Sequence, residues 1–203
     1  VGTAPYGIVT NVSKPYRSFG DVIKTAKAKP DTVTYGSVGS GSLGHLMMTL
    51  VQQTGGFKIV HVPYKGGGPM TVDALGGQVD LAIGTVALLT PHVKGGKLRA
   101  IAVTGDKRSG AVPDVPTVDE SGYPGFVATT WYGIAVPAGT PAAIVTRLHA
   151  GIVQVIAVPE IQTAFAAQGA EPVGNSPEEF AAFIAFELKR YAKIVKDSGM
   201  RAD

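Results

Sequence analysis

The sequence predicts an α/β fold in which most strands run parallel. Strand-like and helix-like segments alternate over about the first half of the chain, a pattern typical of sheets covered by helices. The 27 Gly and 14 Pro residues fall mostly between short apolar runs, as expected for frequent tight turns. Hydrophobic residues make up 45% and charged residues 16% of the 203, which is enough apolar material for a core and argues against a disordered chain. This length allows one large domain or two small lobes.

The alternation extends as far as Thr104. The expected strands are residues 6–12, 32–36, 57–62, 79–83 and 98–103, and the helices between them are residues 18–29, 45–54, 69–75 and 86–93. The first helix opens with the Ser18-Phe-Gly-Asp21 capping pattern, and Pro91 interrupts the last one. Repeated strand–helix–strand units favour a parallel sheet.

The alternation of short strands and helices ends after Thr104. Residues 105–125 are a polar, proline-containing loop with a single helical turn expected at residues 117–121, and this loop is the expected boundary between two lobes. Residues 126–136 are unusually long for a strand and are expected to cross from one lobe to the other. Trp131 and Tyr132 are expected to pack at that crossing.

Helices dominate the remaining residues. Thr140 and Pro141 are the expected N-cap and first residue of a helix that ends near residue 157. A helix over 159–168 and a short strand over 170–173 follow. The capping box Ser176-Pro-Glu-Glu179 opens a terminal helix that Gly199 is expected to end. One apolar stripe is predicted on this helix, comprising Phe180, Phe183, Ile184, Leu188, Tyr191 and Val195.

Composition and charge exclude several classes of protein. With no Cys, the chain has no disulfide, thiol nucleophile or thiolate metal site. The net charge of +3 comes from scattered Lys and Arg, which is weak evidence for a nucleic-acid partner. No apolar run approaches the ~18 residues of a membrane span, and the histidines are not spaced like a metal site, so no metal or cofactor is expected. The chain begins at Val1 without a leader, so we expect a mature or truncated chain.

The segment Gly39-Ser-Gly-Ser-Leu-Gly44 matches the G-x-G-x-x-G pattern between a predicted strand and helix. A dinucleotide site needs an acidic residue at the end of the next strand, and that strand ends in His61-Val-Pro-Tyr-Lys65, where only Lys65 could face a 2′-phosphate. A hydrolase elbow is also close, because Ser40-Gly-Ser42-Leu-Gly44 departs from G-x-S-x-G only at its first position. Such a site needs Asp80 or another Asp, and His92 or His149, to complete a triad with Ser42. Both readings stay open.

A third hypothesis requires no catalytic group. Backbone N–H groups and Ser hydroxyls at a helix N-terminus form an anion site that suits a carboxylate, although Gly and Ser there can also serve only as a turn and a cap. A second cluster, Val62-Pro-Tyr-Lys-Gly-Gly-Gly68, likewise follows a strand and precedes a helix. Because such loops gather at the carboxyl edge of the strands, we expect the two clusters to face one crevice.

Several motifs together resemble a known family, the substrate-binding receptors of tripartite tricarboxylate transporters, often called Bug proteins. The resemblance covers essentially the whole chain. The motifs are His61-Val-Pro-Tyr-Lys-Gly66, Gly76-Gly-Gln-Val-Asp80, Gly95-Gly-Lys-Leu-Arg-Ala-Ile-Ala-Val-Thr104, Pro113-Asp-Val-Pro-Thr-Val-Asp-Glu-Ser-Gly122, Trp131-Tyr-Gly133, Pro137-Ala-Gly-Thr-Pro141 and Gln168-Gly-Ala-Glu-Pro172.

The resemblance implies a periplasmic binding protein-like fold of type II, with two lobes and mixed or parallel sheets. It implies a periplasmic receptor that closes on a small organic acid and delivers it to membrane permease subunits, with no catalytic role and no cofactor. Family members begin with a segment that has no counterpart before Val1. On this basis residues 1–125 form the second, ligand-binding lobe with a crossover strand, and residues 126–203 return to a first lobe that is incomplete. An incomplete lobe exposes apolar edges and favours self-association.

The resemblance also implies the ligand-binding residues. They are Ser37, Gly39, Ser40, Gly41, Ser42, His45, Tyr64, Lys65, Gly66 and Thr85. For His45 the alternative is packing against Tyr35, and for Lys65 it is a solvated loop charge. The alternative function from another class is the effector-sensing domain of a LysR-type transcription regulator, which shares the two-lobed architecture.

Overall fold

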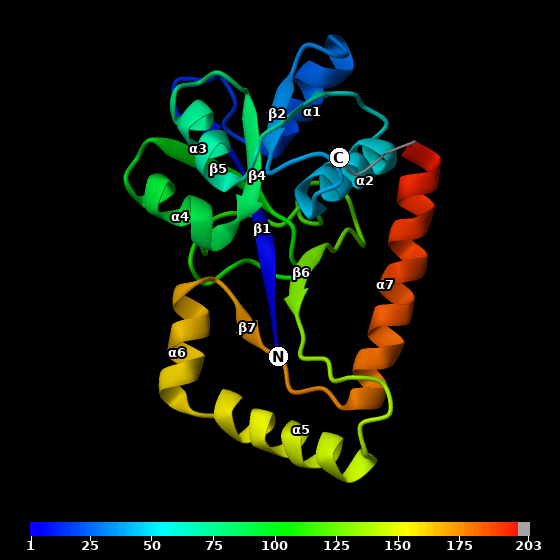
Figure 1. The fold of residues 1–203 in the computed structure, drawn as a ribbon. Coiled ribbons are helices and arrows are strands. Elements are labelled where there is room, and N and C mark those ends of the chain that lie inside the picture. The colour runs from blue at the N-terminus through cyan, green and yellow to red at the C-terminus, as the bar shows by residue number, and fades with distance from the viewer. Residues whose placement is uncertain (199–203) are drawn as a thin grey trace.

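One long strand, β1 (Gly2–Asn11), joins the two parts of the molecule in the computed structural model, which describes residues 1–198. Its residues 2–5 pair with β6 and β7, and its residues 6–11 pair with β4 and β5 (Figure 1). The sequence predicts a strand here only from residue 6, because Gly2 and Pro5 are weak strand formers. Pro5 nevertheless lies opposite Thr129 in the pairing with β6.

The other strands are β2 (Thr34–Ser37), β3 (Val60–Pro63), β4 (Leu81–Thr85), β5 (Leu98–Val103), β6 (Thr129–Tyr132) and β7 (Glu171–Pro172). The helices are α1 (Phe19–Ala28), α2 (Leu43–Gly55), α3 (Gly67–Leu75), α4 (Val86–Lys94), α5 (Ala142–Ile156), α6 (Pro159–Ala167) and α7 (Pro177–Ser198). Each expected helix forms, and α4 continues through Pro91 rather than stopping there.

The main sheet has the strand order β3-β2-β4-β1-β5. The predicted parallel pairing is confirmed for β2 with β3 and for β2 with β4. It is wrong for β1, which runs antiparallel to both β4 and β5. The alternation of strands and helices does not reveal this reversal, because β1 enters the sheet from the other part of the molecule rather than through a crossover helix. The sheet is therefore mixed, and the fold is α/β.

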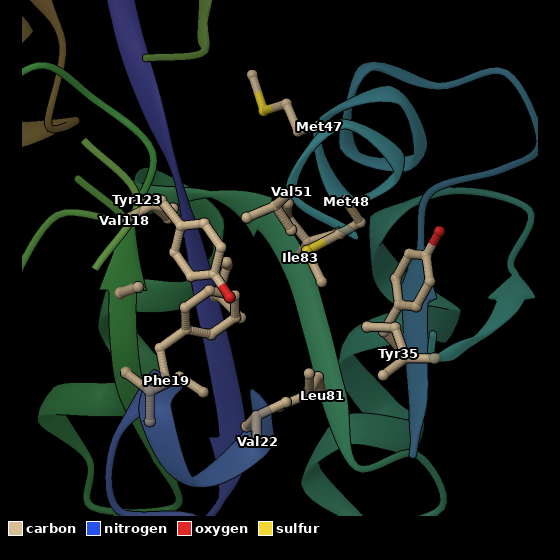
Figure 2. Close-up of a cluster of buried hydrophobic side chains, with 14 of the residues drawn as sticks. Phe19, Val22, Tyr35, Met47, Met48, Val51, Leu81, Ile83, Val118 and Tyr123 are labelled. Carbon is tan, nitrogen blue, oxygen red and sulfur yellow. The ribbon is translucent and has the colours of Figure 1, made fainter. Parts of the chain in front are cut away.

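Two apolar cores form, one on each face of the main sheet. Neighbouring residues of β1 divide between them, since Ile8 lies in the core beneath α1 and α2 and Val9 lies in the core beneath α3 and α4. Figure 2 shows the first core, where the ring of Phe19 meets that of Tyr123 edge-on with centroids 6.1 Å apart. This arrangement places β2, β4 and β1 between two layers of helices.

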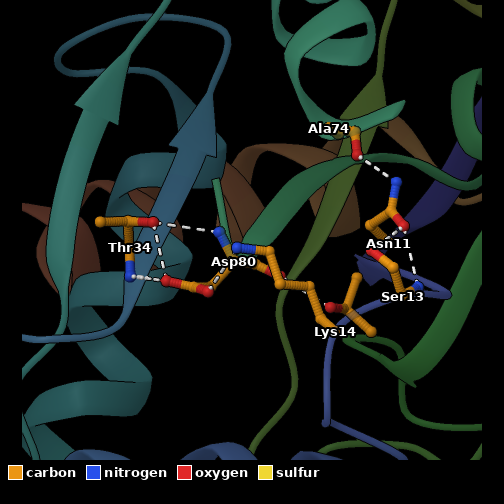
Figure 3. Close-up of polar contacts among 7 residues, drawn as sticks. Asn11, Ser13, Lys14, Thr34, Ala74 and Asp80 are labelled. Atoms are coloured by element: carbon orange, nitrogen blue, oxygen red, sulfur yellow. Dashed lines mark hydrogen bonds and ion pairs between the residues drawn. The ribbon is translucent and has the colours of Figure 1, made fainter. Parts of the chain in front are cut away.

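Polar side chains lie where the amino ends of β2 and β4 meet the carboxyl end of β1 (Figure 3). The carboxylate of Asp80, just before β4, lies 3.0 Å from the ammonium of Lys14. The side-chain amide of Asn11 donates to the carbonyl of Leu75 at 2.8 Å and to that of Ala74 at 3.2 Å. The Gly76-Gly-Gln-Val-Asp80 motif therefore has a structural use at the edge of the sheet opposite the candidate site.

The second part of the molecule contains β6, β7 and the last three helices. The strand expected over 126–136 is shorter than predicted, because only β6 pairs with β1. Pro141, not Thr140, occupies the N-cap position of α5, and the Thr140 hydroxyl donates to the carbonyl of Pro137 instead. The capping box of α7 is confirmed, with Ser176 N–H donating to Glu179 at 2.8 Å and Glu179 N–H donating to the Ser176 hydroxyl at 3.1 Å.

Helix α7 runs back along the molecule and packs against α2 (Figure 1). The predicted apolar stripe is wrong at two positions, because Leu188 is 67% exposed and Val195 is 38% exposed. Glu187 and Ile194 are buried in their place. The buried face thus follows the i, i+3, i+4 and i+7 positions counted from Phe180, which include an acidic side chain. Gly199, the predicted C-cap, lies outside the described residues.

Helix α5 lies at one end of the molecule, joined to α6 across a sharp bend (Figure 1). Its exposed apolar side chains include Ile144, Leu148 and Val155. No single helix within residues 1–198 is long and apolar enough to cross a membrane; α5 and α6 together pass by length and composition but are bent by 75°. The division of the chain into lobes at residue 125 stays a prediction.

Candidate functional site

Three helix N-termini gather at the carboxyl edge of the parallel strands. Strand β2 leads through residues 38–42 into α2, β3 leads through residues 64–66 into α3, and β4 leads directly into α4. The N-caps of these helices are Ser42, Gly66 and Thr85. Since the first N–H groups of a helix lack intrahelical partners and carry partial positive charge, this edge favours an anion.

Ser37 is the centre of the first loop. Its side chain is 0% exposed, and its hydroxyl lies 2.7 Å from Nε2 of His61. The same oxygen accepts the N–H of Gly39 at 3.3 Å and the hydroxyl of Ser42 at 3.4 Å, and it donates to the carbonyl of Gly39 at 3.0 Å. Ser37 therefore stabilises the loop through these hydrogen bonds. Its side chain is fully buried and surrounded by protein.

Glycine is required at the bends of both loops. Gly39 has φ +145°, Gly41 has φ +71° and Gly66 has φ +103°, in the region that side chains disfavour. Ser42 caps α2 by accepting the N–H of His45 at 3.4 Å. Ser40, between the two strained glycines, is partly exposed, as are Gly41 and Ser42. The loop thus exposes small side chains and backbone groups at the N-terminus of α2.

The second loop lies against the first. Tyr64 N–H donates to the carbonyl of Ser37 at 3.0 Å, and Gly66 N–H donates to that of Val38 at 3.2 Å. The hydroxyl of Tyr64 instead points toward α3 and donates to Asp73 at 2.7 Å. Partial burial and this bond raise the pKa of Tyr64 to about 12. Lys65 is exposed and makes no ion pair within residues 1–198.

Thr85 lies at the end of β4, on the same edge. Its hydroxyl accepts the N–H of Leu88 at 3.4 Å, so it caps α4 as Ser42 caps α2. It is paired across the sheet with Tyr6, whose pKa is raised by burial and then by Tyr132. The start of α2 reaches β4 closely, because a methyl group on Gly44 would lie 3.1 Å from the side chain of Ile83.

The structure therefore brings the predicted residues of both loops together and places Thr85 at the same edge. It also adds His61, which is not among the predicted ligand-binding residues. The ring of His61 lies between those of Tyr35 and His45, with centroids 4.9 Å and 3.8 Å away. In the sequence His61 begins the His61-Val-Pro-Tyr-Lys-Gly66 motif near the end of a predicted strand, but neither feature predicts this stack.

The hydrolase triad of Ser42 with Asp80 and His149 is not assembled. The hydroxyl of Ser42 bonds to Ser37, the carboxylate of Asp80 bonds to Lys14 and Thr34, and Nε2 of His149 lies 3.1 Å from the carbonyl of Asn175. The proposed hydrolase triad is thus divided among three places. Within residues 1–198, no group of three or more His, Cys, Asp or Glu side chains is placed to hold a metal ion.

The large apolar cavity of the molecule lies away from these loops. It measures about 930 Å³ and is lined mainly by α5, together with Val1, Ile134 and Phe165. Its lining is apolar and includes one charged side chain, Arg147. Such an apolar lining offers a carboxylate few partners. The large cavity and the candidate anion site therefore lie in different parts of the molecule.

Comparison with known proteins agrees with the geometry. Residues 1–200 match the family model described as tripartite tricarboxylate transporter family receptor. Protein BugT of Bordetella pertussis is 38% identical over 201 residues, which are 99% of this chain and 62% of that protein. The chain thus spans less than two thirds of this relative's length.

Solved structures show the same fold. The R. palustris protein Rpa4515 with adipate superposes with a TM-score of 0.87 at 32% identity, covering 98% of this chain and 67% of that one. The periplasmic binding protein BugD gives a TM-score of 0.81 at 32% identity, covering 100% and 69%. MatC from Rhodopseudomonas palustris, with bound malate, gives 0.80 at 26% identity, covering 96% and 67%. These similarities confirm the periplasmic binding protein-like fold. The chain belongs to the tripartite tricarboxylate transporter receptor family.

Proposed function

We propose that this chain is the carboxylate-binding part of a periplasmic solute receptor. The observation that carries the proposal is the gathering of three helix N-termini, two of them capped by hydroxyl side chains, at one edge of the sheet. Oriented N–H groups and hydroxyls bind a carboxylate without transferring a proton. The related proteins that hold adipate and malate support the same class of ligand.

Within this proposal the predicted residues have different roles. Ser40 presents its N–H group and hydroxyl to the ligand, and Thr85 adds the start of α4. Gly41, Ser42 and Gly66 shape the two loops around it, since their N–H groups donate to His45, Gly39 and Val38. Lys65 supplies an exposed positive charge beside the loops. Ser37 and Tyr64 support the loops, since the hydroxyl of Ser37 is buried and that of Tyr64 is bonded to Asp73. Gly39 provides the bend, and His45 holds the loop from the first turn of α2.

The two-lobed division belongs to the proposal. Residues 1–125 form the ligand-binding lobe, and residues 126–203 form the returning part of the other lobe. Residues 2–5 of β1 and the segment before β6 connect them, as the pairing of β1 with both sets of strands supports. The ligand is then delivered to membrane permease subunits. Family membership favours this receptor role over a transcription regulator's effector domain.

Binding is tested by isothermal titration calorimetry of the chain with adipate and malate. The Ser40→Trp variant is expected to lose binding at least tenfold, because the indole fills the space before α2. Gln162→Trp, at an exposed position on α6, is the matched control and is expected to bind normally. Equal binding by both variants contradicts the assigned site, and no heat with either acid or with a broad panel of carboxylates contradicts the function.

Delivery is tested separately in bacterial cells that lack their own receptor for the acid. The gene that encodes this chain is expected to restore uptake of the radiolabelled acid, and its Ser40→Trp variant is expected not to. Uptake that is the same with and without the gene contradicts delivery.

Self-association forms a further part of the proposal, with a second copy of the chain as the partner. The exposed face of α5 carries Ile144, Leu148 and Val155 around the large apolar cavity. Burial of such a patch against an equal patch removes apolar surface from water on both copies. Sedimentation velocity measures the outcome directly.

A further inference from the structure

We propose that Gly169, in the turn between α6 and β7, is a positioning residue for the candidate site, because its lack of a side chain lets this turn pack against the first residue of α4. The inference rests on the proposed function and concerns the arrangement of that same site. It gives a role to the motif Gln168-Gly-Ala-Glu-Pro172, which is distant in the sequence from both loops of the site.

The turn reaches the start of α4 closely. Gly169 is buried, and a methyl group on it would lie 2.8 Å from Cγ1 of Val86 and 3.2 Å from the hydroxyl oxygen of Ser109. Carbon atoms in contact prefer separations of about 3.5–4.0 Å, so a side chain here must displace its neighbours. Val86 is the first residue of α4 and directly follows the cap Thr85. Figure 1 shows the turn between α6 and β7 beneath α4.

Both sides of this contact rest on β1. On the α4 side, Val86 is 2% exposed, and a methyl group on Gly7 would lie 3.9 Å from its Cγ2. On the α6 side, a methyl group on Gly2 would lie 2.5 Å from the ring of Phe165. Neither side therefore has free space behind it. We expect an added side chain at Gly169 to force Val86, and with it the start of α4, out of its place.

The backbone of Gly169 supplies a second reason for glycine, which the experiment must separate from this contact. Its φ is +64°, and the N–H groups of residues 169 and 170 donate to carbonyls near the end of α6, each at 2.9 Å, as at many helix ends. Gly96 follows α4 in the same way, with φ +68° and N–H groups of residues 96 and 97 that donate to carbonyls in α4 at 3.0 and 3.1 Å. A methyl group on Gly96 would meet nothing within 4 Å. Gly96→Ala therefore has a similar backbone cost without the contact.

The same turn also makes an ion pair with the loop after β5. Nζ of Lys107 lies 2.9 Å from the Glu171 carboxylate, and the two side chains are 63% and 53% exposed. Both residues, together with Gly169, line a cavity of about 240 Å³, so packing between the two segments is incomplete. Ion pairs this exposed contribute little to stability. The buried contact of Gly169 with Val86 is therefore the one we expect to fix the position of the turn.

The first experiment needs no ligand. In the ¹⁵N-labelled chain, NMR compares the amide resonances of residues 85–88 in the unchanged chain, Gly169→Ala and Gly96→Ala. We expect Gly169→Ala to move these resonances and Gly96→Ala to leave them in place, because only the first variant adds a methyl group against Val86. Resonances that stay in place in Gly169→Ala, or that move equally in Gly96→Ala, overturn the contact.

The second experiment measures adipate affinity by calorimetry. We expect Gly169→Ala to weaken binding several-fold and Gly96→Ala to leave it unchanged. Val86→Ala removes Cγ1, so adding it to Gly169→Ala is expected to recover most of the loss, with Val86→Ala alone as the reference. A glycine needed only to end α6 would not be rescued by a change at Val86. Unchanged affinity in Gly169→Ala, or no recovery in the double variant, overturns the proposal.

Two further outcomes are decisive. If Gly169→Ala does not fold, the double variant with Val86→Ala is expected to fold, as judged by circular dichroism, and a double variant that does not fold overturns the contact. If the resonances of residues 85–88 move in Gly169→Ala but the unchanged chain binds neither adipate nor malate, the result contradicts the proposed function and supports the contact.

Discussion

The carboxylate of Asp80 accepts both the backbone N–H and the hydroxyl of Thr34, each at 3.0 Å (Figure 3). The N–H of Asp80 in turn donates to the Thr34 hydroxyl at 3.0 Å. This reciprocal pair fastens β2 to β4 at their amino ends. The opposite ends of the same strands carry the loops of the candidate site, so the pair fixes the spacing of two of the three helix N-termini.

Replacement of Asp80 by Asn is expected to lower the free energy of unfolding by about 2 kcal/mol. The Asn amide accepts hydrogen bonds at one oxygen where the carboxylate accepts them at two, and the Lys14 ammonium loses its partner. Urea unfolding followed by circular dichroism measures the change. Asp114→Asn, at an exposed position, is the control and is expected to stay within about 0.5 kcal/mol. Identical midpoints for both variants would show that Asp80 is not a structural residue.

Helix α7 carries a buried acid that depends on one arginine. Arg190 lies 3.4 Å from the Glu187 carboxylate and also donates to the carbonyl of Val127. The Tyr191 hydroxyl nearby is buried without a hydrogen-bond partner among the described residues. Burial and then the Glu187 charge raise the pKa of Tyr191 to about 12. The buried carboxylate of Glu187 thus depends on Arg190 for charge compensation.

Arg190→Met is therefore expected to destabilise the fold by about 3 kcal/mol, because it leaves the Glu187 carboxylate buried without its cation. The double variant Glu187→Leu, Arg190→Met removes both charges and is expected to recover part of the loss. Urea unfolding of the two variants makes the comparison. A double variant no more stable than Arg190→Met alone contradicts this explanation.

Tyr64→Phe is expected to cost about 1 kcal/mol near neutral pH, because Asp73 loses its donor. The pKa of Tyr64 is raised to about 12 from 10.0, so the folded protein holds the phenol proton more tightly than the unfolded chain. This contribution to stability is fully present below about pH 10 and is lost as the pH rises through about 12. Urea unfolding at increasing pH should show the gap between the two proteins closing. Tyr132→Phe, at an exposed ring, serves as control, and a gap that does not change with pH contradicts the assignment.

The apolar face of α5 gives a prediction about association. Ile144→Lys combined with Leu148→Lys is expected to shift the sedimentation profile from associated species toward monomer at equal concentration. Both side chains are about half exposed, so the free energy of unfolding of the monomer should change by less than about 1 kcal/mol. Arg147→Lys, between the two positions, is the control. A wild-type chain that sediments as a monomer at all concentrations contradicts self-association.

The order of strands and helices was largely predictable from the sequence, because each carries a local signal. Ser18 and Ser176 mark helix starts that the structure confirms with reciprocal capping bonds. The direction of β1 was not predictable, because it depends on where the chain enters the sheet and not on any residue in the strand. The predicted apolar stripe of α7 is wrong at Leu188, because Glu187, a charged residue, occupies the buried position beside it.

The candidate site was predictable in its backbone and unpredictable in its side chains. Glycine and serine between a strand and a helix predict a loop at a helix start, and Gly39 and Gly41 do adopt positive φ. The sequence does not show that the hydroxyl of Tyr64 turns toward Asp73, or that His61 stacks on His45. Both depend on pairings across the sheet that join residues distant in the chain.

The most direct test of the central claim is to map where a carboxylate touches the chain. Backbone amide resonances are followed by NMR while adipate, and then malate, is added. The proposed function predicts that the largest shifts fall on residues 40–45, 66–68 and 86–88, at the three helix N-termini. Shifts confined to α5 and its apolar cavity, or no shifts with either acid, contradict it.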